Sequence, residues 1–275
     1  MTTLAGKTAL VSGGGRGIGA AIAHKLATHG ANVVVNDLDP DAAAAVVTSI
    51  EAAGGTAVAC AGNVTQDGFA ERFVETAVTT FGGVDIIVNN AGYTWDGVIQ
   101  KTTDDQWDAI LDVHLKAPYR ILRAAQPVIS AAAKREKAAG QRVTRKVVNI
   151  SSLAGLYGNA GQVNYSSAKA GILGLTKAMS KEWGRYNVTV NAVAFGLIKT
   201  RLTEASADGD AVVDIAGREI KVGVNPAILQ AAQHIAPLGR LGTPDEAAGA
   251  VYLLCLPESD YITGEVLACS GGLIG

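Results

Sequence analysis

The sequence is poor in cysteine, in charge and in long apolar runs, and each shortage excludes a class of protein. Its three cysteines, Cys60, Cys255 and Cys269, lie among apolar neighbours without CxxC spacing, which indicates reduced, buried thiols rather than a disulfide framework. The four histidines show no ligand pattern, so we expect no metal site. The formal net charge of -2 gives no global attraction to nucleic acid or to anionic membranes, and we expect neither as a partner.

Apolar stretches are short along the whole chain. No window reaches the roughly 20 continuous apolar residues that a membrane span needs. The β-rich run at residues 8–12 ends in three glycines, so we expect no signal peptide and a soluble, cytoplasmic protein. The 275 residues are 48% hydrophobic and only 17% charged, so they can bury a sizeable core. Without a repeat or a linker-like change in composition, we expect one domain over residues 1–275.

Short β-rich runs alternate with Ala-rich stretches at helical spacing. The β-rich runs are almost continuously apolar, as strands buried on both faces require. This order predicts an α/β fold: a Rossmann-like, doubly wound sheet of seven parallel strands with helices on both faces. Strands are predicted at residues 8–12, 32–36, 57–61, 84–89, 147–151, 188–193 and 265–269, and helices at 18–28, 41–53, 69–81, 104–134, 164–185 and 244–256. Residues 201–240 are long for a passive connection and are predicted to form a substrate lid.

A glycine-rich turn, SGGGRGIG, joins the first predicted strand to the first predicted helix. Gly13, Gly17 and Gly19 would let the backbone approach the pyrophosphate of a dinucleotide at a helix N-terminus, where free N–H groups and the helix dipole favour an anion. Gly15, Arg16 and Ile18 belong to the same predicted site. The spacing is GxxxGxG rather than GxGxxG, and tight packing alone can also require such a turn.

Asp37 closes the second predicted strand, about twenty residues after the glycines, where a carboxylate can bind the adenosine ribose hydroxyls. A 2′-phosphate would meet like charge there, so we expect NAD(H) to be preferred. NADP(H) stays possible because Arg16 offers some compensation. The alternative is that Asp37 only caps the next turn, and the nearby Asp39 and Asp41 make that alternative easier.

Tyr165 and Lys169 are four residues apart in a predicted helix, so their side chains project from one face. A nearby ammonium stabilises a phenolate and is expected to lower the pKa of the tyrosine toward a useful range for proton transfer. Pairs with this spacing also arise by chance, so the pair alone is weak evidence.

Several motifs occur together in one order: SGGGRGIG, Asn89-Asn90-Ala91-Gly92, Ser151-Ser152 and Tyr165-Ser166-Ser167-Ala168-Lys169. In this order and spacing the chain resembles the short-chain dehydrogenase/reductase family over essentially its whole length. GNAGQVNYSSAKAGILGLTKA and YITGEVL make it most similar to the 3-oxoacyl-(acyl-carrier-protein) reductase group.

The resemblance implies roles for individual residues. Tyr165 would be the general acid/base, Lys169 would also bind the nicotinamide ribose, and Ser152 would orient the carbonyl oxygen. Ser152 is preferred to Ser151 because of the family's thirteen-residue spacing to the tyrosine. The cofactor site implied by the family further includes Leu38, Asn63, Val64, Asn90, Ala91, Gly92, Ile198 and Thr200. Turn formation by Asn63 and strand-end capping by Thr200 remain as alternatives.

Two positions depart from the family pattern. His114 stands where the family has an Asn whose backbone carbonyl helps to hold a relay water, so His114 is either a relay residue or a helix residue without chemistry. Phe195 replaces the usual proline of a Pro-Gly motif after the sixth strand, which frees φ and restores an N–H donor.

The resemblance implies an oxidoreductase that interconverts a carbonyl and a secondary alcohol, with 3-oxoacyl thioesters as the favoured substrates and a homotetramer or homodimer as the assembly. A catabolic secondary-alcohol or hydroxysteroid dehydrogenase is the alternative enzyme, and a catalytically silent dinucleotide-binding regulator is the alternative class. A basic run could dock an acyl carrier protein or the phosphates of coenzyme A, or it could be a solvated helix end. This run comprises Lys134, Arg135, Lys137, Arg142, Arg145 and Lys146.

Overall fold

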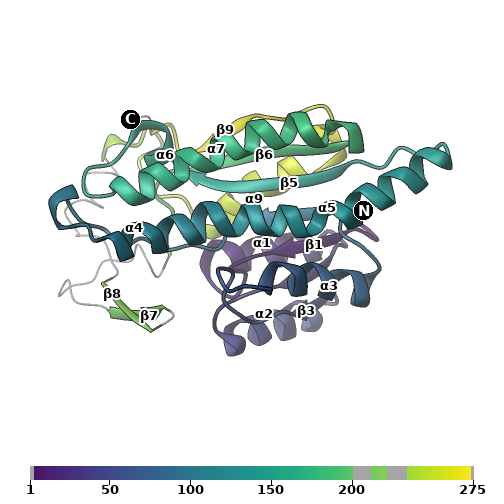
Figure 1. Cartoon of the computed structure of the whole chain (residues 1–275), viewed down its shortest axis with the longest axis horizontal. Coiled ribbons are helices and arrows are strands. Elements are labelled where there is room, and N and C mark those ends of the chain that lie inside the picture. Colours follow the sequence, from purple (N-terminus) through teal and green to yellow (C-terminus); the bar gives the residue numbers. More distant parts are fainter. Residues whose placement is uncertain (1–2, 201–211, 216, 222–233, 274–275) are drawn as a thin grey trace.

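The computed structural model of the chain describes residues 3–200, 212–215, 217–221 and 234–273. Its centre is a seven-stranded parallel sheet with strand order β3-β2-β1-β4-β5-β6-β9 (Figure 1). The predicted fold class is confirmed, and each predicted strand has its counterpart in the sheet. The strands are β1 (Thr8–Val11), β2 (Asn32–Val35), β3 (Thr56–Ala59), β4 (Ile86–Asn89), β5 (Arg145–Ser152), β6 (Val188–Phe195) and β9 (Val266–Cys269).

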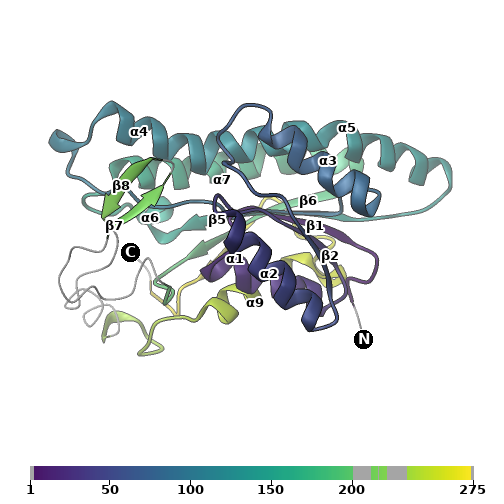
Figure 2. The same ribbon diagram turned by 90° about the horizontal axis from the view of Figure 1, so that it is seen from below.

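Helices cover both faces of the sheet (Figure 2). One layer holds α1 (Gly17–Thr28), α2 (Pro40–Ala52) and α9 (Pro244–Cys255), and the other holds α3 (Phe69–Phe81), α5 (Ala117–Ala138) and α7 (Val163–Trp183). Because strand side chains alternate between faces, Val11 joins the first core with Leu26, whereas Leu10 joins the second core with Phe73. No helix in the described ranges is long and apolar enough to cross a membrane.

The order of the strands reverses beside β1. This strand pairs with β2 on one side and with β4 on the other, so the chain winds in opposite directions from the centre. In open parallel sheets of this kind, ligands bind outside the carboxyl ends of the strands at the point of reversal. The predicted glycine turn and Asn90 follow β1 and β4, and therefore lie at this crevice.

Two predicted segments differ from the structure. The helix predicted at 104–134 is divided into α4 (Asp104–Leu111), a π-helix at Asp112–Lys116 and α5. Within the predicted lid, β7 (Val212–Ile215) and β8 (Arg218–Lys221) form an antiparallel hairpin that the sequence analysis did not predict. Residues 201–211, 216 and 222–233 of that lid lie outside the described residues.

Candidate active site

A cavity of about 1640 Å³ extends along the carboxyl ends of the strands. It brings together residues that are predicted from widely separated motifs, from the glycine turn at one end to Tyr165 at the other. The predicted site residues that line it are Gly13, Arg16, Gly17, Ile18, Asp37, Leu38, Asn63, Val64, Asn90, Ala91, Gly92, His114, Ser152, Tyr165, Lys169, Ile198 and Thr200. Phe195 lines it as well, at the end of β6.

Gly15 and Gly19 do not line this cavity, and instead they shape the turn. A Cβ on Gly19 would lie 1.9 Å from the carbonyl oxygen of Gly13, so only glycine lets helix α1 start so close to the strand. Gly13 and Gly17 have φ values of 61° and 52°, which side chains disfavour. The resulting cradle opens at the N-terminus of α1, which attracts anions. These residues therefore fit the pyrophosphate of a dinucleotide.

Asp37 and Arg16 form a charged corner of the cavity. The Asp37 carboxylate accepts hydrogen bonds from the backbone N–H groups of Gly15 (3.0 Å) and Asp39 (3.1 Å). Arg16 Nη2 lies 2.6 Å from Asp39 and Nη1 lies 3.9 Å from Asp37. Asp39, not Asp37, caps helix α2. Arg16 is therefore already engaged by two carboxylates, which weakens its compensation for a 2′-phosphate.

Asparagine side chains brace the cofactor end of the cavity. Asn90 donates from Nδ2 to the carbonyl oxygens of Ser12 and Gly13, both at 3.0 Å. Asn36, which is 1% exposed, accepts from the Gly13 N–H and donates to the Gly62 carbonyl at 2.9 Å. Asn36 was not among the predicted site residues, although a polar side chain directly after an apolar strand was a usable signal.

Asn63 lines the cavity and also forms a turn. Its Oδ1 accepts hydrogen bonds from the backbone N–H and the hydroxyl of Thr65, both at 2.9 Å. Arg120 of α5 fixes the same loop by donating to the Thr65 carbonyl at 2.9 Å. The Asn63 side chain therefore forms a turn, as the alternative interpretation states. Its position in the cavity wall also agrees with the predicted cofactor site.

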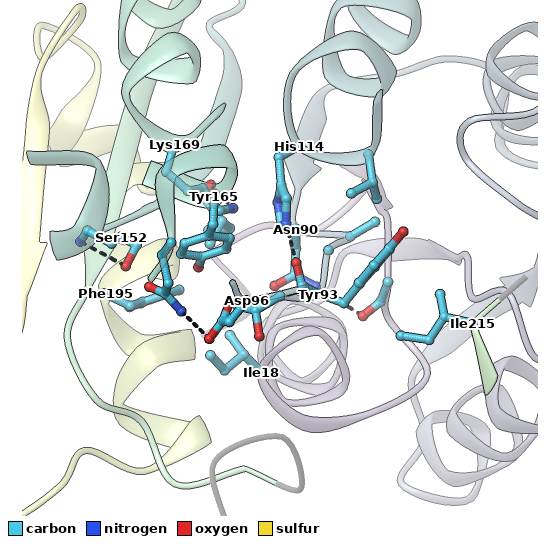
Figure 3. A pocket seen from close by; sticks show the side chains of 18 of the residues that line it. Ile18, Asn90, Tyr93, Asp96, His114, Ser152, Tyr165, Lys169, Phe195 and Ile215 are labelled. Carbon is cyan, nitrogen blue, oxygen red and sulfur yellow. Dashed lines mark hydrogen bonds between the residues drawn. The ribbon is translucent and has the colours of Figure 1, made fainter. Parts of the chain in front are cut away.

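The two serines at the end of β5 differ in their contacts. Ser151 is 2% exposed, and its hydroxyl donates to the Lys169 carbonyl at 2.8 Å. Ser152 faces the cavity and lies with Tyr165 and Lys169 on its left-hand side in Figure 3. Helix α7 carries both Tyr165 and Lys169, as the spacing predicts. The geometry thus favours Ser152 over Ser151 as the hydroxyl beside the tyrosine.

The protonation states of Tyr165 and Lys169 follow from burial. Burial raises the pKa of Tyr165 to about 12, a hydrogen bond with Ser152 opposes that rise, and the charge of Asp96 adds to it. Burial also lowers the pKa of Lys169 to about 7. The prediction that the pKa of Tyr165 is lowered is wrong for this structure, because burial is the largest influence and raises it. Lys169 Nζ donates to the Ile150 carbonyl at 2.8 Å and lies 5.7 Å from the phenol ring centroid. Tyr165 therefore keeps its proton at neutral pH, as a proton donor must.

Asp96 belongs to the site and was missed from the sequence. It lines the cavity, and its Oδ2 accepts a hydrogen bond from Gln162 at 2.8 Å (Figure 3). Burial raises the pKa of its carboxyl, while hydrogen bonds to Gln162 and Thr94 act in the opposite direction. Asn164, next to the tyrosine, donates to the Trp95 carbonyl at 3.1 Å. The segment after β4 is thereby fastened to the start of α7.

His114 lies in the π-helix, and two features of the backbone around it support the backbone role implied by the family. The Ala117 N–H donates to the Asp112 carbonyl, five residues back. Pro118, four residues after His114, has no N–H and cannot donate to the His114 carbonyl. That carbonyl is therefore spared its usual helical donor.

Of the two alternatives for the basic run, docking patch or helix end, the structure favours the helix end. Arg145 and Lys146 are buried in β5, where Arg145 pairs with Glu136 and Lys146 lies 2.7 Å from Asp260. Lys134, at the far end of α5, is exposed but distant from the cavity. The 22 residues of α5 span about 33 Å, and the cavity lies beyond the first of them. This run stabilises the amino end of β5 and the end of α5, and does not flank the site.

Comparisons with known proteins agree with this geometry. The family model described as Enoyl-(Acyl carrier protein) reductase matches residues 13–274. The chain is 36% identical to the 3-oxoacyl-[acyl-carrier-protein] reductase FabG of Chlamydia muridarum over 98% of both chains. It is 37% identical to the 3-oxoacyl-[acyl-carrier-protein] reductase of Synechocystis sp. over 100% of this chain and 99% of the other.

Solved structures show the same relationship. A mutant of a short-chain dehydrogenase/reductase from Serratia marcescens superposes with a TM-score of 0.81 at 29% identity, covering 98% of both chains. With the matches in sequence, this likeness extends over the strands, the glycine turn and the Ser-Tyr-Lys group. The chain therefore belongs to the short-chain dehydrogenase/reductase family and is an NAD(P)(H)-dependent oxidoreductase that acts on CH–OH groups.

Proposed function

We propose that this protein reduces 3-oxoacyl thioesters to 3-hydroxyacyl thioesters, with NADH as the preferred cofactor. The observation that carries the proposal is a half-buried, protonated Tyr165 that lies with Ser152 and Lys169 in the same cavity as the glycine turn. The names of the relatives favour this substrate class over the secondary-alcohol and hydroxysteroid alternatives. A silent regulator would not need the intact Ser-Tyr-Lys group.

The site residues divide the work of reduction between them. Ser152 orients the carbonyl oxygen of the substrate, and Tyr165 delivers its phenolic proton to that oxygen as the carbon is reduced. Lys169 stabilises the phenolate that is left, since its ammonium form attracts negative charge. When bound, the nicotinamide supplies the hydride. Asn90 and Asn36 keep the glycine turn in shape for the cofactor's phosphates.

The preference for NADH is supported by the charged corner at Asp37. Its carboxylate faces the cavity with two backbone N–H groups already bound, so a 2′-phosphate would bring like charge beside it. Arg16, the nearest cation, is held by Asp39. A ribose with both hydroxyl groups free can instead donate to the Asp37 carboxylate.

We propose further that the residues act as a single domain, that the thioester is attached to an acyl carrier protein or to coenzyme A, and that the enzyme works in the cytoplasm. Matches over nearly the full length support the single domain, and the relatives' names support the carrier. All three cysteines are free thiols, which suits a reducing compartment.

Turnover of acetoacetyl-CoA with NADH, followed at the cofactor's absorbance, tests the proposal. Tyr165→Phe removes the proton donor and should lower kcat by about 10² to 10⁴ while NADH binding stays within a few-fold. Tyr186→Phe is the matched control, because it removes the same hydroxyl group from a tyrosine that contacts Gln126 of α5 and does not line the cavity. If Tyr165→Phe keeps more than about a tenth of wild-type turnover when chemistry limits the rate, Tyr165 is not the acid.

A further inference from the structure

His114 is a buried titratable group that the reaction above does not use. It is 4% exposed and lies in the π-helix between α4 and α5, a type of distortion that is common at functional sites. Its ring faces the ring of Tyr165 edge-on, with centroids 5.1 Å apart and planes at 87° (Figure 3). Aromatic rings in this arrangement attract one another and resist rotation.

Two contacts fix the imidazole in place. Nε2 lies 2.7 Å from the Tyr93 carbonyl oxygen, and because a carbonyl only accepts, Nε2 carries the proton. On the side of Gly92, the ring fills the space that a side chain would need: a Cβ on Gly92 would lie 1.9 Å from His114 Cε1. The ring is therefore anchored at one edge and packed against backbone at another.

The remaining nitrogen shows that the imidazole is neutral. Nδ1 is buried and has no protein hydrogen-bond partner, which suits a lone pair but not a second N–H. Burial and the charge of Lys169 both hold the pKa of His114 well below its usual value, and the bond to Tyr93 only partly opposes them. An apolar ring would fill this space without burying an unpaired nitrogen, so packing alone does not account for a histidine here.

We propose that His114 is a positioning residue for the catalytic tyrosine. Its neutral imidazole, anchored to the Tyr93 carbonyl, forms the wall that holds the Tyr165 phenol toward Ser152 and the substrate carbonyl. An asparagine, the usual family residue, is too short to give both the anchor and the edge-on contact. The inference rests on the proposed role of Tyr165, and it assigns a side-chain function beside the backbone role of the same residue.

His114→Phe tests the proposal because it keeps an aromatic ring and removes the anchoring N–H. Misplacing a catalytic group by a fraction of an ångström costs about tenfold to a hundredfold, so kcat should fall by that factor, while the Kd for NADH changes by less than about twofold. Ile110→Val, a change in the buried side of α4, is the control for loosened packing and should keep wild-type kcat. A His114→Phe enzyme with kcat within about twofold of wild type would overturn the proposal, and so would a loss of NADH binding as large as the loss of kcat.

A second experiment uses a double variant, so its outcome does not depend on whether His114→Phe folds correctly. Gly92→Ala must displace the imidazole, so its effect on kcat should largely disappear in a His114→Ala background. Independent, multiplicative losses in the double variant would contradict the proposal. Failure of the proposed function has a different signature, because the wild-type enzyme would then not reduce acetoacetyl-CoA, whereas the effect of His114→Phe can still be measured with a small neutral ketone that the enzyme does reduce.

Discussion

Asp37 combines two tasks that a substitution can separate. Its charge repels a 2′-phosphate, and its oxygens hold the N–H groups of Gly15 and Asp39. We expect the wild type to prefer NADH and Asp37→Ser to narrow that preference, because a ribose hydrogen bond and a phosphate repulsion are lost together. The measurement is the ratio of kcat/KM for NADH to kcat/KM for NADPH.

Asp37→Asn is the matched variant, since it removes the charge and keeps an oxygen acceptor of the same length. If repulsion dominates, Asp37→Asn should narrow the preference nearly as much as Asp37→Ser. A wild-type preference for NADPH would refute the assignment of Asp37 outright.

Lys169 makes stability depend on pH. Burial lowers its pKa from 10.5 to about 7, so between these values the unfolded chain binds a proton that the folded chain does not. Stability should therefore rise with pH across this window, and Lys169→Met should flatten the rise. Urea unfolding without cofactor at pH 7, 8 and 9 measures the free energy of unfolding of wild type and variant. These pH values lie below the range in which Tyr165 titrates. Equal slopes for the two proteins would show that Lys169 is already charged in the fold.

Single residues were predictable where spacing decides their place. The four-residue interval places Tyr165 and Lys169 together on α7, and strand alternation separates Ser151 from Ser152. The direction of the tyrosine's pKa was not predictable, because it depends on burial that only the assembled fold defines. Asn164 was missed for a similar reason: its bond to the Trp95 carbonyl joins residues 69 apart in sequence.

Strands and helices were predictable where apolar runs have a clear period and clear boundaries. The seven sheet strands match the predicted runs, and burial on both faces of the five inner strands favours such apolar runs. The π-helix at Asp112–Lys116 was not predictable, since one extra residue per turn leaves the helical pattern nearly unchanged. Hairpin β7–β8 was not predicted because its short apolar pieces are interrupted by glycine and charged residues, and its strands gain their partners from each other and from α4.

Hairpin β7–β8 is joined to the wall of the cavity by one arginine. Arg218 lies 2.6 Å from Asp105 of α4 and 5.9 Å from the Trp95 ring, and Ile215 of the hairpin lines the cavity. We expect Arg218→Gln to raise KM for a long-chain 3-oxoacyl thioester. Because an exposed ion pair contributes little, the rise should be at most about fivefold. Turnover of a small neutral ketone should hardly change, because the residues beside Tyr165 are untouched.

Asp105→Asn should raise the KM for the long-chain thioester by the same factor. If the two side chains act as a pair, the KM of the double variant should be close to that of either single variant. Steady-state kinetics with thioesters of increasing chain length measure this. A rise in KM that is equal for short and long chains would show that the hairpin does not contact the acyl chain.

At the scale of the whole molecule, the two ends of the sheet have separate tasks. The carboxyl ends of the strands carry the cavity, whereas the amino end of β5 holds the buried cations Arg145 and Lys146 in ion pairs. This separation explains why Arg145 and Lys146 are not available for docking: their charges are used in ion pairs at the end of the fold opposite the cavity.

Exposed apolar side chains that indicate assembly lie along β9. This strand is the edge of the sheet, and apolar side chains lie exposed on and around it: Leu253 (58%), Tyr261 (97%), Ile262 (42%) and Leu267 (38%). Clustered exposed apolar residues beside an unpaired edge mark an interaction surface. We therefore expect this face to be buried between copies of the chain in a homodimer or homotetramer.

Sedimentation or light scattering should give a mass that is a multiple of 28.1 kDa. Leu253→Glu combined with Tyr261→Glu should lower that mass, because buried charge without a partner opposes association, whereas Lys137→Glu at the exposed end of α5 should not. A wild type that sediments as a monomer would contradict this assignment, and an unchanged mass in the double variant would place the interface elsewhere on the molecule.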